Sequence, residues 1–196
     1  MAKFNEQRIA ARLKDMEVPE KFIPQFIAMG QLQDMKRGEM VVDIGENCQK
    51  AYIVLNGGFV SQRIGQKGVA RTVNFFLDMY RPYMTSFHSY FQEEPSRVLI
   101  KAIKPSTALV LDKSKLAKLH GAHKDFKDFT IERIVHALLA ENEFKGYLIS
   151  KPPEELYGIL LERFPNMHRD VPAKYIAEFM GISRVWLSKL RKEVLK

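Results

Sequence analysis

The chain has 196 residues, of which 46% are hydrophobic and 28% charged, an ordinary globular balance that excludes a largely disordered protein. Charged side chains interrupt the first apolar residues, and no apolar run reaches the ~18 residues that a membrane span needs. We therefore expect no signal peptide and a cytoplasmic protein without a membrane partner. The only cysteine, Cys48, excludes an intrachain disulfide, a four-cysteine zinc site and an iron–sulfur cluster.

The charge of the chain is positive and unevenly distributed. There are 31 Lys and Arg residues against 23 Asp and Glu residues, a net charge of +8. Such an excess favours anionic partners but does not separate DNA from RNA or a membrane surface. Between positions 183 and 196 there are five basic residues and one acidic residue, a net charge of +4. Half of the excess therefore lies at the C-terminal end.

The first thirty or so residues have the periodicity of helices, broken at Pro19 and Pro24. Between positions 32 and 111 the pattern changes to short β-branched or aromatic runs separated by glycines and charged turns. These runs cover positions 40–44, 51–55, 59–64, 71–77, 98–103 and 108–111. Short strands at this regular spacing predict an antiparallel sandwich or barrel.

From about Lys113 the pattern is helical to the end of the chain. Apolar residues at three- and four-residue intervals are Phe126, Phe129, Ile131, Ile134, Val135, Leu138 and Leu139. Because positions 126–150 contain no proline and one glycine, they predict a helix of more than twenty residues, about 30 Å long. Its apolar face either packs within its own chain or pairs two copies of the chain, and the spacing alone fits both.

Pro152 and Pro153 mark the next boundary, followed by a short helix over 154–163 and a polar connection over 165–170. We therefore expect a β domain with N-terminal helices at 1–124, a long helix at 125–150 and a helical domain at 151–196. The expected fold class is α+β.

Positions 172–194 have the pattern of a helix-turn-helix. Pro172 suits the first turn of a helix, Gly181 suits the left-handed backbone of a tight turn, and Ser183 suits the N-cap of a second helix. The residues expected to be buried are Ile176, Ala177, Phe179, Met180, Ile182, Leu187 and Leu190. Their spacing is that of the DNA-binding motif, and an ordinary helical hairpin is the alternative.

The opposite face of the second helix carries hydrogen-bond donors, namely Arg184, Ser188, Lys189, Arg191 and Lys192. A helix in the major groove needs such donors, because Arg and Lys reach guanine and phosphate. Trp186 is expected to pack at the edge of this helix. The spacing of the motif and the donors on its second helix predict a DNA-binding transcription regulator. Because no nucleophile–base pair and no phosphate-binding glycine loop stand out, we do not expect an enzyme.

With these features, nearly the whole chain resembles the Crp/Fnr regulators, the family of the bacterial cyclic-AMP receptor protein. Positions 36–58, KRGEMVVDIGENCQKAYIVLNGG, carry two Gly-Glu turns, each followed by a strand, the second ending in a glycine turn. The resemblance implies a jelly-roll-like β-roll sensor of the cyclic-nucleotide-binding type, a dimerisation helix and the helix-turn-helix domain. It also implies a homodimer on a pseudo-palindromic double-stranded site, with half-sites about one helical turn apart, and RNA polymerase as a further partner.

On the family pattern the base-facing positions are Arg184, Val185, Ser188 and Lys189. The candidate DNA-binding residues are then Ser183, Arg184, Val185, Ser188, Lys189, Arg191 and Lys192. Val185 replaces an acidic residue often found there, which implies a different target sequence and suits contact with a thymine methyl. Because the sequence stops at Lys196, the β wing that usually follows is expected to be short or absent.

The sensor segment departs most from the family. Cyclic-nucleotide binders carry a Gly-Glu and then an Arg-Ser or Arg-Ala, whereas positions 82–102 hold no glycine and the reversed pair Ser96-Arg97. Candidate ligand contacts are His88, Glu93 or Glu94, Ser96 and Arg97. Another small-molecule effector, or none, is therefore expected in place of cyclic AMP, and a haem on His88 stays an alternative. No other cofactor is expected.

His120 and His123 are spaced to share a helix face, which fits either a metal site or, as we expect, a solvated helix end. The alternative to a DNA-binding regulator is a ligand-binding signalling module that acts through protein partners, with the helical end as its docking element.

Overall fold

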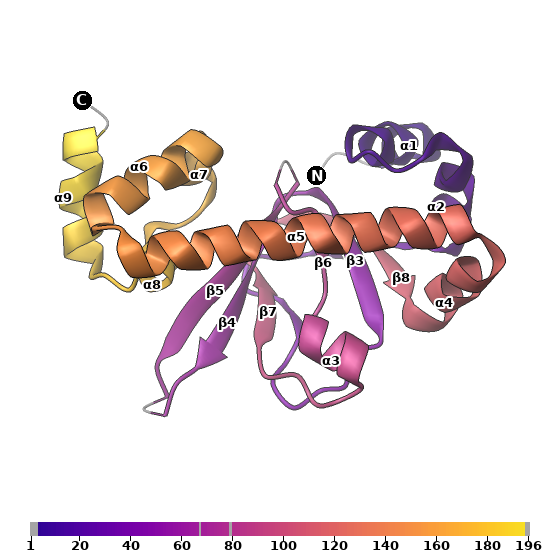
Figure 1. Cartoon of the computed structure of the whole chain (residues 1–196), viewed down its shortest axis with the longest axis horizontal. Coiled ribbons are helices and arrows are strands. Elements are labelled where there is room, and N and C mark those ends of the chain that lie inside the picture. The colour runs from indigo at the N-terminus through magenta and orange to yellow at the C-terminus, as the bar shows by residue number, and fades with distance from the viewer. Residues whose placement is uncertain (1–3, 67, 79, 195–196) are drawn as a thin grey trace.

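The computed structural model describes residues 4–66, 68–78 and 80–194. Two sheets lie beneath one long helix, with the N-terminal helices at one end of that helix and the C-terminal helices at the other (Figure 1). This arrangement confirms the expected α+β class with an antiparallel β-roll and C-terminal helices.

The N-terminal helices cover one end of the molecule. They are α1 (Glu6–Asp15), a 3₁₀ turn (Glu20–Phe22) and α2 (Ile23–Met29). Asn5 caps α1, because its side chain accepts a hydrogen bond from the Arg8 backbone N–H at 2.9 Å. Phe22 and Phe26 pack edge-on against Phe126 at centroid distances of 5.0 and 5.5 Å, which ties these helices to the start of the long helix.

The β-roll consists of two four-stranded sheets in which all pairings are antiparallel. The strands are β1 (Gln31–Met35), β2 (Met40–Val42), β3 (Lys50–Asn56), β4 (Gly58–Ile64), β5 (Ala70–Leu77), β6 (Tyr83–Met84), β7 (Leu99–Ala102) and β8 (Ser106–Asp112), with α3 (Phe87–Gln92) between β6 and β7. One sheet has the order β1-β8-β3-β6 and the other β2-β7-β4-β5. β1 and β6 lie outside the runs predicted from the sequence.

Gly57 makes the turn between β3 and β4. Its φ is +98°, and a Cβ atom there would lie 2.7 Å from the Ser106 Cα, so no other residue fits without moving β8. The neighbouring Gly58 N–H donates to the Ser106 hydroxyl at 2.9 Å. The predicted glycine turn therefore exists because two strands approach closely at this point.

The interior between the two sheets is filled with apolar side chains. Phe59, Met35, Val54, Ile100 and Ala102 are all fully buried there. Around them lie further buried residues of the same cluster: Val42, Cys48, Tyr52, Phe76, Met84, Ala108 and Val110. The roll is thus a packed core, with side chains from both sheets in contact.

The C-terminal half is helical, as predicted. Its helices are α4 (Lys113–Ala122), α5 (Lys124–Ser150), α6 (Pro153–Arg163), α7 (Met167–Asp170), α8 (Ala173–Met180) and α9 (Arg184–Val194). One expectation is wrong: positions 165–170 are not only a polar connection, because they form α7 and bury Met167 to 2% exposure. The pattern missed α7 because a helix of four residues shows little periodicity.

A second hydrophobic cluster joins the β-roll to the C-terminal helices. Val60, Phe75 and Leu77 of the roll share this cluster with α6 to α9 and with Phe144 of α5. Phe75 packs edge-on against Phe179 of α8 at 5.1 Å. The C-terminal helices therefore have a defined position against β4 and β5.

Candidate nucleic-acid interface

The turn between α8 and α9 has the backbone geometry that the sequence predicts. Gly181 ends α8 with a φ of +69°, and the Ile182 N–H donates to the Ala177 carbonyl at 3.0 Å. Ser183 then caps α9, because its hydroxyl accepts a hydrogen bond from the Trp186 N–H at 3.1 Å. These local bonds fix the angle at which α9 leaves α8.

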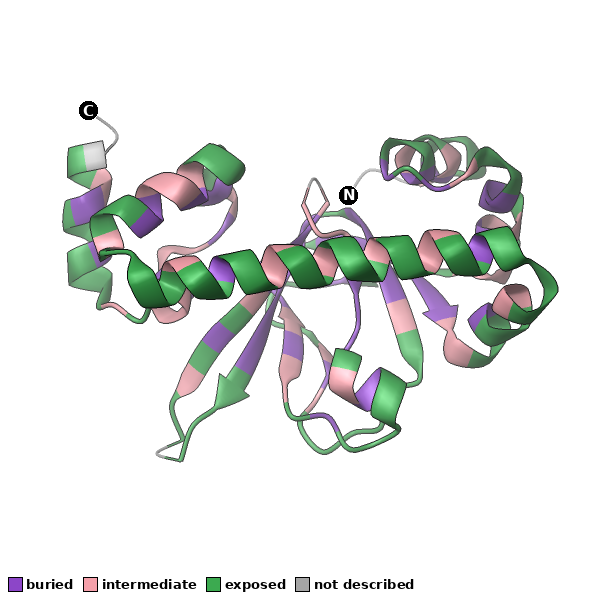
Figure 2. Ribbon diagram, viewed as in Figure 1, coloured by how far each residue is buried: buried purple, intermediate pink, exposed green. Residues whose placement is uncertain are grey.

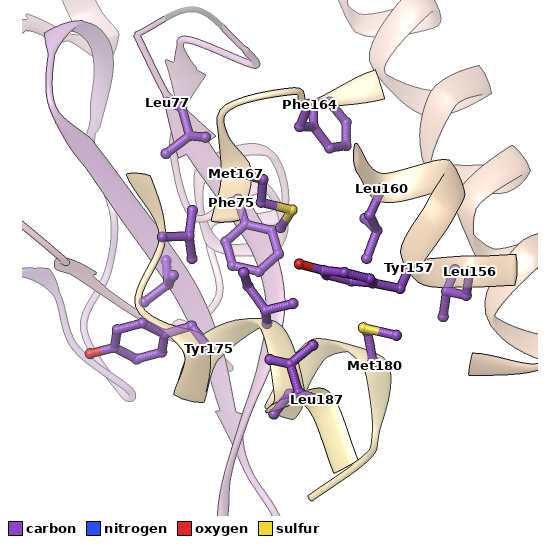
Figure 3. Packing of buried hydrophobic residues seen from close by; sticks show 14 of the residues in the cluster. Phe75, Leu77, Leu156, Tyr157, Leu160, Phe164, Met167, Tyr175, Met180 and Leu187 are labelled. Carbon is purple, nitrogen blue, oxygen red and sulfur yellow. The ribbon is translucent and has the colours of Figure 1, made fainter. Parts of the chain in front are cut away.

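The inner faces of the two helices share one core with α6. Ala177, Leu187 and Leu190 are 2%, 0% and 1% exposed. Tyr157 of α6, which is fully buried, lies in the centre of this core between Leu160 and Met180 (Figure 3). Truncating any of these side chains would leave a cavity, so the core holds α9 as part of a rigid unit.

The outer face of α9 is exposed and rich in donors. Arg184, Val185, Ser188, Lys189 and Lys192 are all exposed, and at 100° per residue they fall within one 140° sector of the helix. In the part of the chain that the structure describes, Arg184, Lys189 and Lys192 make no hydrogen bond or ion pair. Their charged groups are therefore available to a partner.

Two of the predicted contact residues lie differently. Arg191 is on the flank of α9 beside Leu187, half-buried, and its Nε and Nη2 are buried without a hydrogen-bond partner. The Ser183 hydroxyl is occupied by its cap hydrogen bond. Trp186 is 42% exposed at the other flank of the helix. The exposed donor face is thus narrower than the sequence alone indicates.

α8 is held on the β-roll by a partly buried polar contact. The Glu178 carboxylate accepts hydrogen bonds from Gln62 Nε2 at 2.5 Å and from the Thr72 hydroxyl at 2.7 Å. Gln62 and Thr72 are 1% and 4% exposed. Lys104 and Asp170 add an ion pair at 3.4 Å. The bonds of Glu178 could not be predicted from the sequence, because Gln62 and Thr72 lie more than 100 positions away from it.

Most of the long helix α5 is exposed to solvent (Figure 2), and apolar residues are among its exposed side chains. Its inner face is anchored at the two ends by the buried Phe126 and Phe144. Its outer face carries Ile131, Ile134, Val135, Leu138 and Leu139, which are 38–62% exposed and recur at three- and four-residue intervals. Exposed apolar stripes of this kind mark helix–helix interfaces.

Three of the predicted ligand residues of the sensor segment, His88, Glu94 and Arg97, pair with one another. Glu94 bonds to His88 Nε2 at 2.7 Å and to Arg97 Nη2 at 2.9 Å, and the hydrogen bond and charge of His88 lower the pKa of the Glu94 carboxyl. Glu93 has a left-handed backbone (φ +60°) and pairs with Lys113 at 2.8 Å, which lowers the pKa of its carboxyl.

The fourth ligand candidate, Ser96, is 2% exposed. Its hydroxyl shares a hydrogen bond with Ser86 at 2.7 Å and donates to the Val98 carbonyl. Arg97 and Glu94, with Ile44 and Arg63 opposite, line an open surface hollow of about 670 Å³. The candidates therefore lie on α3 and in the loop that follows it, but the polar groups of His88, Glu93 and Ser96 are already paired with protein groups.

His120 stacks on the Phe126 ring at 4.9 Å, and its Nε2 lies 3.0 Å from the Thr130 hydroxyl. His123 packs instead against Phe22, at 5.5 Å. Among the described residues, no three His, Cys, Asp or Glu side chains are grouped so that they could hold a metal ion.

None of the described helices is both long enough and apolar enough to span a bilayer.

The sequence matches no model of a known protein family and no curated protein. Solved structures are similar over most of the chain. FixK2 from Bradyrhizobium japonicum has a TM-score of 0.69 and 16% identity, with 85% of this chain and 84% of that chain covered. CLP from Xanthomonas campestris, described as a c-di-GMP responsive global regulator, has a TM-score of 0.67 and 11% identity, with 90% and 92% covered.

A third similar structure is a protein from Eubacterium rectale assigned as a transcriptional regulator of the Crp/Fnr family. Its TM-score is 0.67 and its identity 14%, with 93% of this chain and 86% of that chain covered. The chain therefore has the fold of the Crp/Fnr transcription regulators, and the predicted resemblance is confirmed at the level of the fold.

Proposed function

We propose that this protein is a homodimeric, sequence-specific DNA-binding transcription regulator that acts in the cytoplasm and is not an enzyme. The observation that carries the proposal is the outer face of α9, where Arg184, Lys189 and Lys192 are exposed and have no partner among the described residues, on a rigidly held helix. A helix in the major groove needs this combination of fixed position and free donors.

The contacts on this face divide into two kinds. Arg184, at the start of α9, is placed to read a guanine edge, because the N-terminal residues of a recognition helix contact the bases. Lys192, further along the helix, suits a phosphate contact, and Lys189 is one of the base-facing positions of the family pattern. Val185, 69% exposed, suits a thymine methyl.

A gel-shift assay against genomic fragments at several salt concentrations tests the proposal. Lys192→Ala is expected to lower the salt dependence of binding by about one unit of slope, because one phosphate contact is lost. Lys118→Ala is the matched control, since Lys118 is exposed on α4 at the opposite end of the molecule (Figure 1). If no fragment binds more tightly than bulk DNA, the protein is not a sequence-specific regulator.

A dimer would bring two copies of α9 to one site. The exposed stripe on α5, from Ile131 to Leu139, is the surface we assign to the dimer seam, and closing it in pairs would remove five apolar side chains per chain from water. RNA polymerase is the further partner expected of a regulator with this fold.

We further propose that the β-roll does not respond to cyclic AMP. Positions 82–102 lack the glycine that lets backbone amides approach a phosphate, Ser96 replaces the arginine, and apolar side chains fill the space between the sheets. Calorimetric titration with cyclic AMP is expected to give no saturable heat. Saturable binding would overturn this part of the proposal.

The second candidate function, a signalling module that acts through protein partners, is favoured by the contact of α8 with the β-roll. Glu178 and its two partners hold the helical end against the sensor, as a docking element would require. Replacing Arg184, Lys189 and Lys192 together by alanine separates the two candidates, because a regulator loses DNA binding and activity, whereas the module keeps its activity with the core around Leu187 and Leu190 intact.

A further inference from the structure

A pocket outside the sensor loop lies where three elements meet: the end of α1, the connection between β5 and β6, and the middle of α5. Its volume is about 330 Å³, which is at the lower end of the range for small-molecule sites. Arg12, Arg81 and Arg133, one from each element, line it together with the apolar parts of Met16 and Tyr83. None of these residues belongs to the DNA-binding face.

Two of these arginines have unused hydrogen-bond donors. Arg81 has a side chain only 14% exposed and bonds through Nη1 to Asn74 and to the Glu141 carboxylate, while its Nε and Nη2 are buried without an acceptor. Arg133 pairs with Glu17 and Glu132, and its Nε is likewise without an acceptor. Buried donors without acceptors are unfavourable, so an acceptor at this place would stabilise the fold.

The backbone around the pocket is also unusual. Arg81 (φ +50°) and Glu17 (φ +61°) are both left-handed, and the third such non-glycine residue among those described, Glu93, lies in the sensor loop. Residues other than glycine adopt this conformation at a cost and are found at ligand-binding and switch regions. Two of the three left-handed residues therefore line the same pocket as the arginines with unused donors.

We propose that this pocket binds a small ligand bearing an oxyanion, either a carboxylate or a phosphate, with Arg81 and Arg133 as its donors. Planar guanidinium groups match both oxyanions by paired hydrogen bonds. Met16, Tyr80 and Tyr83 offer apolar surface to the body of the ligand. Because Asp15, Glu17 and Asp78 also line the pocket, the ligand carries few negative charges.

Such a ligand would contact residues that bond to α5 and pack on the C-terminal helices. Arg81 holds Glu141 of α5, so an oxyanion that takes Arg81 competes with that ion pair. The neighbouring Tyr80 packs on Phe164, just before α7, with ring centroids 3.8 Å apart. This link to the dimer helix and the DNA-binding domain rests on the proposed function, whereas the binding site itself does not.

Isothermal titration calorimetry on the full chain, without DNA, tests whether the pocket lined by Arg81 and Arg133 binds an anion. The probes are benzoate, phenyl phosphate and inorganic phosphate, with benzyl alcohol as the neutral control and chloride keeping the ionic strength constant. We expect saturable binding of at least one anion and none of benzyl alcohol. Binding of benzoate alone identifies a carboxylate ligand, and binding of the phosphates alone identifies a phosphate.

The variants Arg81→Gln and Arg133→Gln are each expected to weaken the anion by about tenfold or more, since each removes a charge-assisted pair of hydrogen bonds. Arg97→Gln, in the other surface hollow, is the matched control and is expected to leave binding unchanged. Circular dichroism verifies that each variant is folded. If Arg81→Gln does not fold, the anion affinity of Arg133→Gln alone tests the proposed site. The proposal is overturned if no probe anion saturates, if benzyl alcohol binds equally well, or if the folded variants keep full affinity.

Discussion

The dimer seam gives the prediction whose magnitude follows most directly from the structure. Leu138 is 57% exposed in the single chain, in the middle of the apolar stripe on α5. Fully burying a leucine side chain contributes about 1.5–3 kcal/mol, so burying its exposed part contributes roughly 1 kcal/mol per copy. A twofold dimer contains the residue twice, and Leu138→Ala is therefore expected to cost about 2 kcal/mol, or roughly 30-fold in the Kd of the dimer.

Sedimentation equilibrium over a concentration series measures this Kd. His136→Ala is the control, because His136 is exposed on the same helix but lies off the apolar stripe. We expect the control to keep the wild-type Kd. An unchanged Kd for Leu138→Ala, or a wild-type chain that stays monomeric throughout the series, would refute the assignment of this face.

Three further predictions concern stability. Leu187→Ala is expected to lower the free energy of unfolding by about 2–5 kcal/mol in urea denaturation, because Leu187 is fully buried under α9. Glu178→Ala leaves Gln62 and Thr72 without their acceptor, and should cost about 1–3 kcal/mol in the same assay, with Glu178→Gln less affected. Burial lowers the pKa of His120 below its ordinary value of 6.5, so the folded state favours the neutral ring. The free energy of unfolding is therefore expected to be highest above pH 6.5 and to fall as the pH drops below it. His120→Gln should lose part of this pH dependence in the same assay.

The features that the sequence predicted well are those set by neighbouring residues. Periodicity marked α5 to within one residue of its start, and the turn between α8 and α9 followed from Gly181 and Ser183, whose roles depend only on the local backbone. The glycine turn at Gly57 was predicted for the same reason. Local conformational preferences are readable from a single chain.

The features that the sequence did not predict depend on tertiary contacts. Nothing near Glu178 indicates that it bonds to Gln62, and nothing near Arg81 indicates that Arg133 lies at the same pocket. The half-buried state of Arg191, with its Nε and Nη2 buried, likewise could not be read from the sequence. For the sensor loop, the sequence named candidate ligand residues, but the mutual pairing of His88, Glu94 and Arg97 required the fold.

The measurement that tests the central claim most directly is hydroxyl-radical footprinting on DNA selected by the purified protein. If two copies of α9 are related by the seam on α5, we expect two protected half-sites whose centres lie about one helical turn apart. Together the two half-sites should form a pseudo-palindromic sequence. Arg184→Ala should keep the spacing but relax the preference at one base pair of each half-site. A single protected segment, or protection without any preferred sequence, would contradict a dimeric sequence-specific regulator.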